Sequence, residues 1–270
     1  MQGDFAVCED GDIILFTPTA ADTYSWMGPN GFVSNLQYPP AITGASYLNQ
    51  GWYVLQVGNN GCGSAADSVY VTVNPKPAVP VLVTNAPICE GEDLVMSTTA
   101  TSDAYQWIAP DGSTATTYTS ALIVPSASNF YQQGLWSLIS IDTATGCESD
   151  PAQVVSVVIK PVPVAIAQNN GPVCSGDPVQ LFANTIPGTL PGALYTWYSD
   201  ASLTTVVSTL MDPVITGLPD GSHDFYLVVT LNGCESLPAM TTVVVSPILP
   251  APQMQGDFAV CEDGDIILFT

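Results

Sequence analysis

The stretch GWYVLQVGNNGCGSAADSVYVTVNP, from Gly51 to Pro75, decides the fold. An aromatic and aliphatic run and a Val-rich run stand on either side of the turn residues Asn-Asn-Gly-Cys-Gly-Ser. Short runs rich in Val and Tyr that are bounded by Gly, Pro and Asn are typical of β-strands. The stretch therefore predicts two strands joined by a turn that carries Cys62.

This pattern occurs three times in the chain. Gly-Cys turns recur at Cys147 and Cys234, each after an aromatic run (GLWSLISI, HDFYLVVT) and before a β-branched run (VVSVVIKP, TTVVVSP). Upstream of each turn stands a Tyr-x-Trp motif, which contains Trp26, Trp107 or Trp197. Seven or so short strands in about 84 residues, with a Trp on the third, are typical of an immunoglobulin-like β-sandwich, in which that Trp is a core residue. No stretch shows a helical period with a cap. We therefore predict an all-β chain of tandem immunoglobulin-like modules. Tyr53 and Tyr226, with Trp136 in the second module, are candidates for the ring residue near the start of strand F.

A second set of cysteines lies upstream of the Trp residues. Cys8, Cys89, Cys174 and Cys261 each precede an acidic, Gly-containing turn (CEDGD, CEGED, CSGDP, CEDGD), at spacings of 81, 85 and 87 residues. Residues 254–270 repeat residues 1–17 letter for letter, so the sequence has a period of 254 − 1 = 253 residues. Such a period is typical of a tandem array in which each unit contacts its neighbours.

Proline-rich joints at 75–80, 161–163 and 247–252 separate the repeats. They predict module 1 at residues 1–76, module 2 at 77–161, module 3 at 162–250, and the first strands of the next copy of module 1 at 251–270. Because proline fixes φ and favours an extended chain, we expect the joints to be spacers with limited swing and the array to be a stiff rod.

The charge is strongly one-sided. Twenty-four acidic residues face Lys76, Lys160 and His223, with no Arg, for a net charge of −22. Nucleic-acid binding is excluded, because it requires Lys and Arg at the phosphates. No run approaches the roughly 18 to 20 apolar residues of a membrane span, so we expect no membrane insertion of this segment. No secretion signal opens the sequence. The composition is that of a soluble protein exposed to salt or divalent cations.

The repeated order of Cys, acidic-Gly turn, Tyr-x-Trp, Gly-Cys, Val-rich strand and Pro-x-Pro resembles a known class of modules. It looks like the Ig-like and PKD-like repeats of giant cell-surface proteins of Bacteroidota, including gliding-motility adhesins exported by the type IX system. The resemblance covers the whole chain. It implies secretion, an extracellular location at the cell surface, and an extended array with neighbouring identical repeats head to tail.

Regularly spaced cysteines in an extracellular sandwich predict disulfides. Two pairings are open. Within modules, Cys8 pairs with Cys62, Cys89 with Cys147, and Cys174 with Cys234, and Cys261 awaits its partner in the next copy. Between modules, Cys8 pairs with Cys147 and Cys89 with Cys234, because the A to B turn and the F to G turn lie at opposite poles of a module, farther apart than a disulfide can reach.

The sequence offers candidate sites for metal binding and for glycosylation. The acidic turns offer oxygen ligands for Ca²⁺ at the joints, as an alternative to ordinary solvated turns; they contain Glu9, Asp10, Asp12, Glu90, Glu92, Asp93 and Asp177. No other cofactor is expected. Bacteroidota glycosylate the hydroxyl of Asp-Ser/Thr before a small apolar residue, so the resemblance also makes Ser68 and Thr143 candidate O-glycosylation sites near F to G turns.

Catalysis is not expected. His223, placed here in a turn, has no nucleophile elbow to serve, and the acidic residues sit in turns without a common cleft. Trp52 and Trp136 are candidates for partly exposed rings. The other candidate exposed positions do not align across the modules; they are Phe32 and Tyr38, Tyr118 and Phe130, and Leu203 and Met211.

The sequence therefore predicts the repeating stalk of a giant secreted surface filament or adhesin, which bears load and projects an adhesive tip. One alternative is a multivalent array that binds surface polysaccharide, and such an array needs the same patch in every module. Another is a self-assembling extracellular sheath or matrix fibre.

Overall fold

The computed structural model is all-β among the residues that it describes, which are 2–3, 5–128, 130–186, 188, 190–253, 255–256, 262 and 268–269. Two short 3₁₀ turns are its only helical elements there, η1 (Pro29–Gly31) and η2 (Tyr47–Asn49). In the described residues no helix has the length and apolar character needed to cross a membrane. Most of the predicted segment 251–270, including Cys261, lies outside the described residues.

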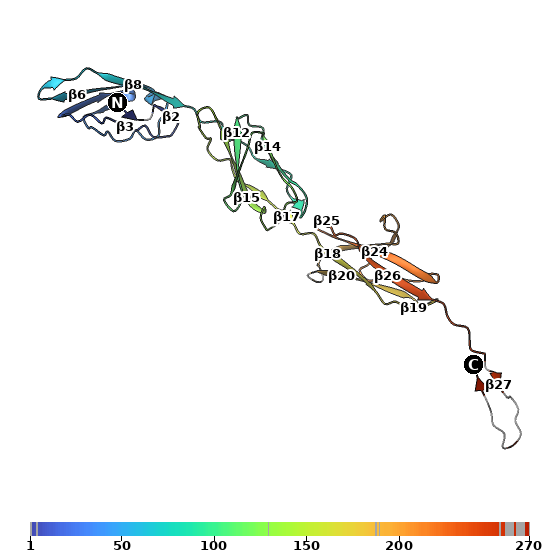
Figure 1. The fold of residues 1–270 in the computed structure, drawn as a ribbon. Helices are drawn as coiled ribbons and strands as arrows, with labels where there is room; N and C mark the ends of the chain where they lie inside the picture. Colours follow the sequence, from blue (N-terminus) through green and yellow to red (C-terminus); the bar gives the residue numbers. More distant parts are fainter. Residues whose placement is uncertain are drawn as a thin grey trace. The chain divides into compact units, whose positions relative to one another are not determined.

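Module 1 is a two-layered sandwich. Its strands are β1 (Gln2–Gly3), β2 (Ala6–Cys8), β3 (Leu15–Phe16), β4 (Thr23–Met27), β5 (Val33–Ser34), β6 (Gly51–Asn59), β7 (Cys62–Gly63) and β8 (Asp67–Asn74). One sheet has the order β2-β8-β6-β4-β5, and β1 pairs with β3 in the other layer (Figure 1). The antiparallel strands β6 and β8 are the two that the Gly51–Pro75 stretch predicts.

Module 2 repeats this plan. Its strands are β9 (Val83–Thr84), β10 (Ile88–Cys89), β11 (Leu94–Ser97), β12 (Ala104–Ile108), β13 (Thr114–Thr117), β14 (Ala121–Val124), β15 (Gly134–Ile141), β16 (Val155–Val157) and β17 (Ile159–Lys160). One sheet has the order β13-β12-β15-β16 and the facing one β14-β11-β9, while β10 pairs with β17.

Module 3 shows the plan most completely. Its strands are β18 (Val164–Asn169), β19 (Val173–Cys174), β20 (Val179–Ile186), β21 (Leu194–Tyr198), β22 (Val206–Ser208), β23 (Val214–Ile215), β24 (Gly221–Leu231), β25 (Cys234–Glu235) and β26 (Ala239–Ser246). The order β18-β20-β23 faces the order β19-β26-β24-β21-β22. The second sheet has six strands, because β25 also pairs with β24, and the short β19 runs parallel to β26. Two facing, mostly antiparallel sheets of this kind are the arrangement of an immunoglobulin-like sandwich. The strands β27 (Gln255–Gly256) and β28 (Leu268–Phe269) pair beyond it.

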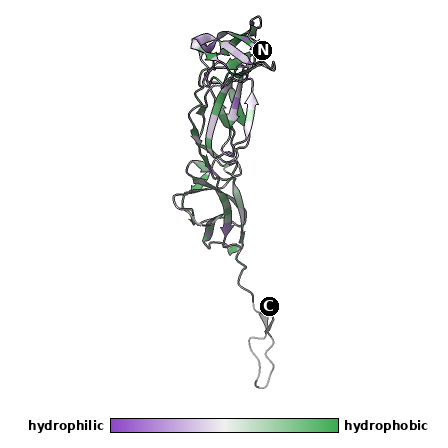
Figure 2. Cartoon of the chain, turned by 90° about the vertical axis from the view of Figure 1, so that its left-hand side faces the viewer, coloured by the Kyte–Doolittle hydropathy of each residue, from purple (hydrophilic) through white to green (hydrophobic). Residues whose placement is uncertain are grey.

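Each module encloses its own hydrophobic core, and hydrophobic segments run through the strands of all three (Figure 2). Trp26, Trp107 and Trp197 are at most 1% exposed, so each lies between the two layers. Their indole N–H groups are also bonded: Trp26 donates to the Leu36 carbonyl at 2.8 Å. The chain divides into two compact units, residues 1–159 and residues 160–270.

A ring residue anchors the start of the long strand in every module. Tyr53 donates its hydroxyl to the carbonyl of Asn49 at 2.9 Å, and Trp136 donates its indole N–H to that of Gln132 at 2.8 Å. In module 3 this place belongs to His223, whose Nε2 lies 2.8 Å from the Pro219 carbonyl.

The structure corrects two of the sequence-based placements. His223 lies in strand β24 and not in a turn. The candidate Tyr226 was wrong, because it lies three residues beyond His223 on the same strand and therefore points to the other face of the sheet. The ring residue at the start of the long strand, which we call the strand corner, keeps a constant distance from the first glycine of that strand. Tyr53 follows Gly51, Trp136 follows Gly134 and His223 follows Gly221 by the same interval.

Candidate functional site: the junction of modules 1 and 2

Cys8 lies where module 1 passes the chain on to module 2. Its strand β2 runs parallel to the last strand β8 and places Cys8 opposite Asn74. The amide of Glu9 donates to the Asn74 carbonyl at 2.8 Å, and the amide of Gly11 closes a turn onto the Cys8 carbonyl at 3.0 Å. Strand pairing and turn together hold the thiol position at the end of the sandwich from which the linker leaves.

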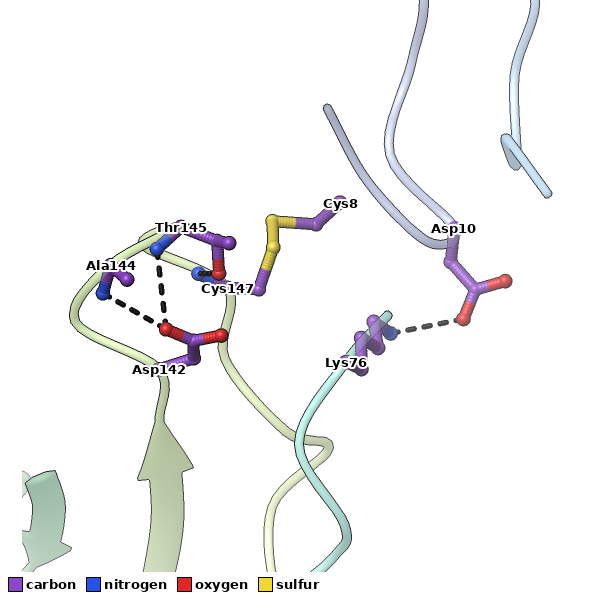
Figure 3. Close-up of a disulfide and its surroundings, with 7 residues drawn as sticks. All are labelled: Cys8, Asp10, Lys76, Asp142, Ala144, Thr145 and Cys147. Atoms are coloured by element: carbon purple, nitrogen blue, oxygen red, sulfur yellow. Dashed lines mark hydrogen bonds and ion pairs between the residues drawn. A yellow bond between two sulfur atoms is a disulfide. The ribbon is translucent and has the colours of Figure 1, made fainter. Parts of the chain in front are cut away.

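Cys147 lies in the loop that joins β15 to the following strands of module 2. The Asp142 amide donates to the Cys147 carbonyl at 2.9 Å. The Asp142 carboxylate accepts hydrogen bonds from the amides of Thr145 at 3.2 Å and Ala144 at 2.9 Å (Figure 3). These backbone bonds, first that of Thr145, lower the pKa of Asp142, because they favour its charged form. The loop is therefore shaped around an ionised side chain.

A disulfide joins Cys8 to Cys147, and so joins module 1 to module 2 (Figure 3). Their Cα atoms are 5.6 Å apart although 139 residues separate them in the sequence. Of the two pairings that the sequence left open, this is the one between modules. A bond between Cys8 and Cys62 would have to run the length of a sandwich, since Cys62 follows β6 and Cys8 lies beside the end of β8.

Lys76 lies between the two modules beside this disulfide. Its Nζ is 3.0 Å from Asp10 of module 1 and 2.9 Å from Asp150 of module 2. The hydrogen bond to Asp150 and then that to Asp10 raise the pKa of Lys76. Both carboxylates are 68% exposed, so solvent screens the ion pairs and they orient the joint more than they stabilise it.

The other cysteines fall into two groups. Cys89 and Cys234 are each in a disulfide. Cys62 and Cys174 are free thiols, and both are exposed. The predicted site at Cys261 lies outside the described residues.

The predicted calcium ligands are used by the chain itself in several places. Glu92 accepts a hydrogen bond from the Cys89 amide at 2.8 Å, Asp93 accepts one from the Ser126 amide at 3.0 Å, and Asp10 binds Lys76. The carboxylates of Asp12, Glu90 and Asp177 are exposed at their turns, and Glu9 is half-buried. Within the described part of the chain, no three acidic, His or Cys side chains gather closely enough to hold a metal ion.

The two predicted glycosylation positions are both exposed. Ser68 lies near the start of strand β8, and Thr143 lies in the Cys147 loop. The Thr143 hydroxyl is 3.2 Å from the Asp103 carboxylate.

Several aromatic and apolar placements differ from expectation. Trp136 is buried, while Trp52 is 60% exposed and meets Tyr70 edge to face. Phe32 packs edge to face on Tyr53 and against the core of module 1, and Met211 packs against the core of module 3. The remaining candidates Tyr38, Tyr118 and Phe130 are 63%, 78% and 81% exposed, and Leu203 is half-buried.

Sequence reasoning missed the charged residues of this junction. Lys76, Asp142 and Asp150 were not candidates, although a lysine in a proline-rich joint is one of only two in the chain. The rarity of positive charge is the signal that would have pointed to it.

Comparison with known proteins adds the following. No family model matches the chain, and no curated protein matches its sequence. Among solved structures, it is similar to the three N-terminal domains of the bacteriophage RB49 highly immunogenic outer capsid protein, at 12% identity and a TM-score of 0.35, over 92% of this chain and 98% of that one. It is similar to a marsupial T cell receptor at 10% identity and a TM-score of 0.39, over 89% and 98%. It is also similar to immunoglobulin domains 1–5 of Sidekick-1, at 14% identity and a TM-score of 0.35, over 90% of this chain and 60% of that one.

Proposed function

We propose that this chain is a structural repeat unit of a giant secreted filament or adhesin stalk, which bears mechanical load outside the cell. The observation that carries the proposal is the Cys8–Cys147 disulfide, which links two modules with separate cores. A bond at this place adds nothing across either core, whereas it limits how far two modules can be pulled apart. That is the property a stalk requires.

The chemistry supports an extracellular site of action. Disulfides persist in oxidising surroundings and are rare where thiols are kept reduced. The net charge of −22 keeps parallel chains from clumping at low salt. The resemblance to repeats of type IX-secreted proteins of Bacteroidota adds the cell surface as the place of attachment. The role we propose is structural, not catalytic.

The polysaccharide-binding alternative has less support. Its strongest feature is the exposed pair of Trp52 and Tyr70, which face each other across β6 and β8. The same cross-strand position holds Leu135 and Ser156 in module 2, and Ser222 and Val244 in module 3. An array that gains avidity by repetition needs one patch in every module, and this pair is confined to one.

The test is electron microscopy of the producing cells with antibodies against residues 1–253. We expect surface fibres that bind the antibody at regular intervals along their length. Label confined to the cell interior, or spread over the surface without fibres, would overturn the proposal.

A further inference from the structure

The two free thiols, those of Cys62 and Cys174, are the groups of a single copy that could bond to another copy of the repeat. Cys62 begins the short strand β7, which follows the turn after β6 at the end of module 1 away from the linker to module 2, and Cys174 ends β19 in module 3. Both are exposed, whereas their bonded equivalents Cys147 and Cys8 are fully buried and half-buried. The difference in exposure follows the difference in bonding.

Cys174 occupies the same structural position in module 3 as Cys8 does in module 1. It lies opposite Ser246 on a parallel strand, as Cys8 lies opposite Asn74. The next residue's amide donates to that partner's carbonyl at 2.8 Å in both modules, and the amide three residues on closes the same turn at 3.0 Å. Cys174 is therefore presented at the outgoing end of its module in the same way.

Cys62 occupies the same structural position in module 1 as Cys147 does in module 2. Ser64 donates its amide to the Val57 carbonyl at 2.7 Å, and its hydroxyl oxygen accepts from the Val57 amide at 3.0 Å. Ser149 makes the same pair of bonds with Ser140, at 2.9 Å and 3.0 Å. Since Ser64 and Ser149 each follow their cysteine by two residues, the two cysteines occupy equivalent places at the incoming end of a module.

The linker that leaves module 3 has the length of the linker that leaves module 1. From Asn74 to Cys89 there are 89 − 74 = 15 residues, and from Ser246 to Cys261 there are 261 − 246 = 15. Because residues 254–270 repeat residues 1–17, that linker leads into another module 1. The next copy thus stands at the same chain distance from module 3 as module 2 does from module 1.

The charged residues of the first junction are replaced together at this second one. The three residues bound to one another there are Lys76, Asp10 and Asp150. Counted from the equivalent cysteines and strand ends, their places are taken by Ile248 and Gly176 of module 3 and by Ala65 of the incoming module 1. Ile248 is 70% exposed in this single copy. Because all three charged residues are absent together, neither a lysine nor a carboxylate of this set is left without its partner at the second junction.

We propose that Cys174 of each copy forms a disulfide with Cys62 of the next copy, so that successive 253-residue repeats are stapled like modules 1 and 2. The inference rests on the proposed function, since it requires a tandem array. In forming the bond, each thiol gives up its hydrogen and the two sulfurs join. Two electrons and two protons pass to a small disulfide oxidant, which leaves as two thiols.

A chain that carries residues 1–253 twice in succession tests this pairing. It is folded in a glutathione redox buffer, isolated as a monomer and alkylated without reduction, and its free thiols are counted by intact mass. C174S in the first copy removes one partner of the proposed bond, whereas C174S in the second copy removes a thiol that has no partner. The two variants are matched in composition.

If the bond forms, C174S in the first copy gains one alkylated thiol relative to the two-copy parent, because Cys62 of the second copy is released. The matched variant loses one. If both variants lose one, Cys174 and Cys62 do not pair and the inference fails. That result would not change the expectation of antibody-labelled fibres on cells. Absence of such fibres would likewise not prevent the thiol count. Failure of the disulfide inference and failure of the proposed function are therefore distinguishable.

Discussion

Cys8 and Cys147 close a single disulfide around 139 residues, a loop that holds most of module 1 and most of module 2. When the chain is pulled from its ends, this segment cannot extend until the bond is cut. A chain that keeps Cys8 and Cys147 and has Ser at the other five cysteines isolates the effect. In single-molecule pulling, we expect reduction to add roughly 500 Å of extensible length, at about 3.6 Å per residue.

The matched control carries C8S in the same background and shows no change on reduction. If reduction leaves the length of the two-cysteine chain unchanged, the disulfide does not limit extension, and the mechanical role of the junction is refuted.

The hydrogen bond of Tyr53 at the start of β6 leads to a second prediction. Tyr53 is fully buried and donates to the Asn49 carbonyl at 2.9 Å. Y53F keeps the ring and leaves a buried acceptor without its donor, so we expect module 1 to lose about 1 to 2 kcal/mol of unfolding free energy. The measurement is urea unfolding followed by tryptophan fluorescence. Y70F is the control, because Tyr70 is 42% exposed, and a loss as large as that of Y53F would show that the corner bond has no special role.

The sequence predicted the fold well because strand runs and turn residues recur at constant places. The Trp of each Tyr-x-Trp motif follows a local pattern, and the structure has it on the fourth strand of every module, β4, β12 and β21, because a short strand precedes the expected second one. The cysteines before the acidic turns likewise end the equivalent short strands β2, β10 and β19. The poles at which Cys8 and Cys147 lie also follow from strand order, so the disulfide between modules was among the expected pairings.

What the sequence did not predict depends on contacts between distant segments. Lys76 meets Asp10 and Asp150 from 66 and 74 residues away, and no local pattern marks that meeting. His223 was placed in a turn because Pro-Asp-Gly-Ser precedes it, whereas pairing with Val243 draws it into β24. Tertiary pairing prevails there over turn composition.

The Lys76 bridge makes the junction sensitive to alkaline pH. Its folded-state pKa is raised above the ordinary value of 10.5, so its stabilising effect is present below that value and is lost as pH rises through the raised pKa. In a C8S/C147S chain, energy transfer between dyes on modules 1 and 2 should therefore fall above about pH 10.5. K76Q should show the lower transfer already at neutral pH. Equal transfer in the two chains at pH 7 would mean that Lys76 does not orient the junction.

Asp142 shapes the loop that presents Cys147, through the amides of Ala144 and Thr145. D142A removes the carboxylate oxygen that accepts both hydrogen bonds. We expect the Cys8–Cys147 bond to form several-fold more slowly when a reduced chain is reoxidised, because the loop must order before the sulfurs meet. The rate is followed by alkylation at timed intervals. D111A is the control, since Asp111 accepts a similar bond from the Ser113 amide in a turn between β12 and β13. Equal slowing by both variants would point to general destabilisation of module 2 instead.

Cys89 and Cys234, each held in a disulfide, provide the last prediction. Cys89 begins the same turn as Cys8, with the Glu92 amide 3.1 Å from its carbonyl. Ser236, two residues after Cys234, makes the bonds to Val229 that Ser149 makes to Ser140. We therefore expect digestion of the unreduced chain to release a peptide that joins Cys89 to Cys234, which disappears from C89S. In C89S, Cys234 should become reactive to alkylation while Cys8 and Cys147 stay protected. A peptide that joins Cys174 to Cys234 would instead place that bond within module 3. The disulfide between modules 1 and 2 would then have no counterpart between modules 2 and 3.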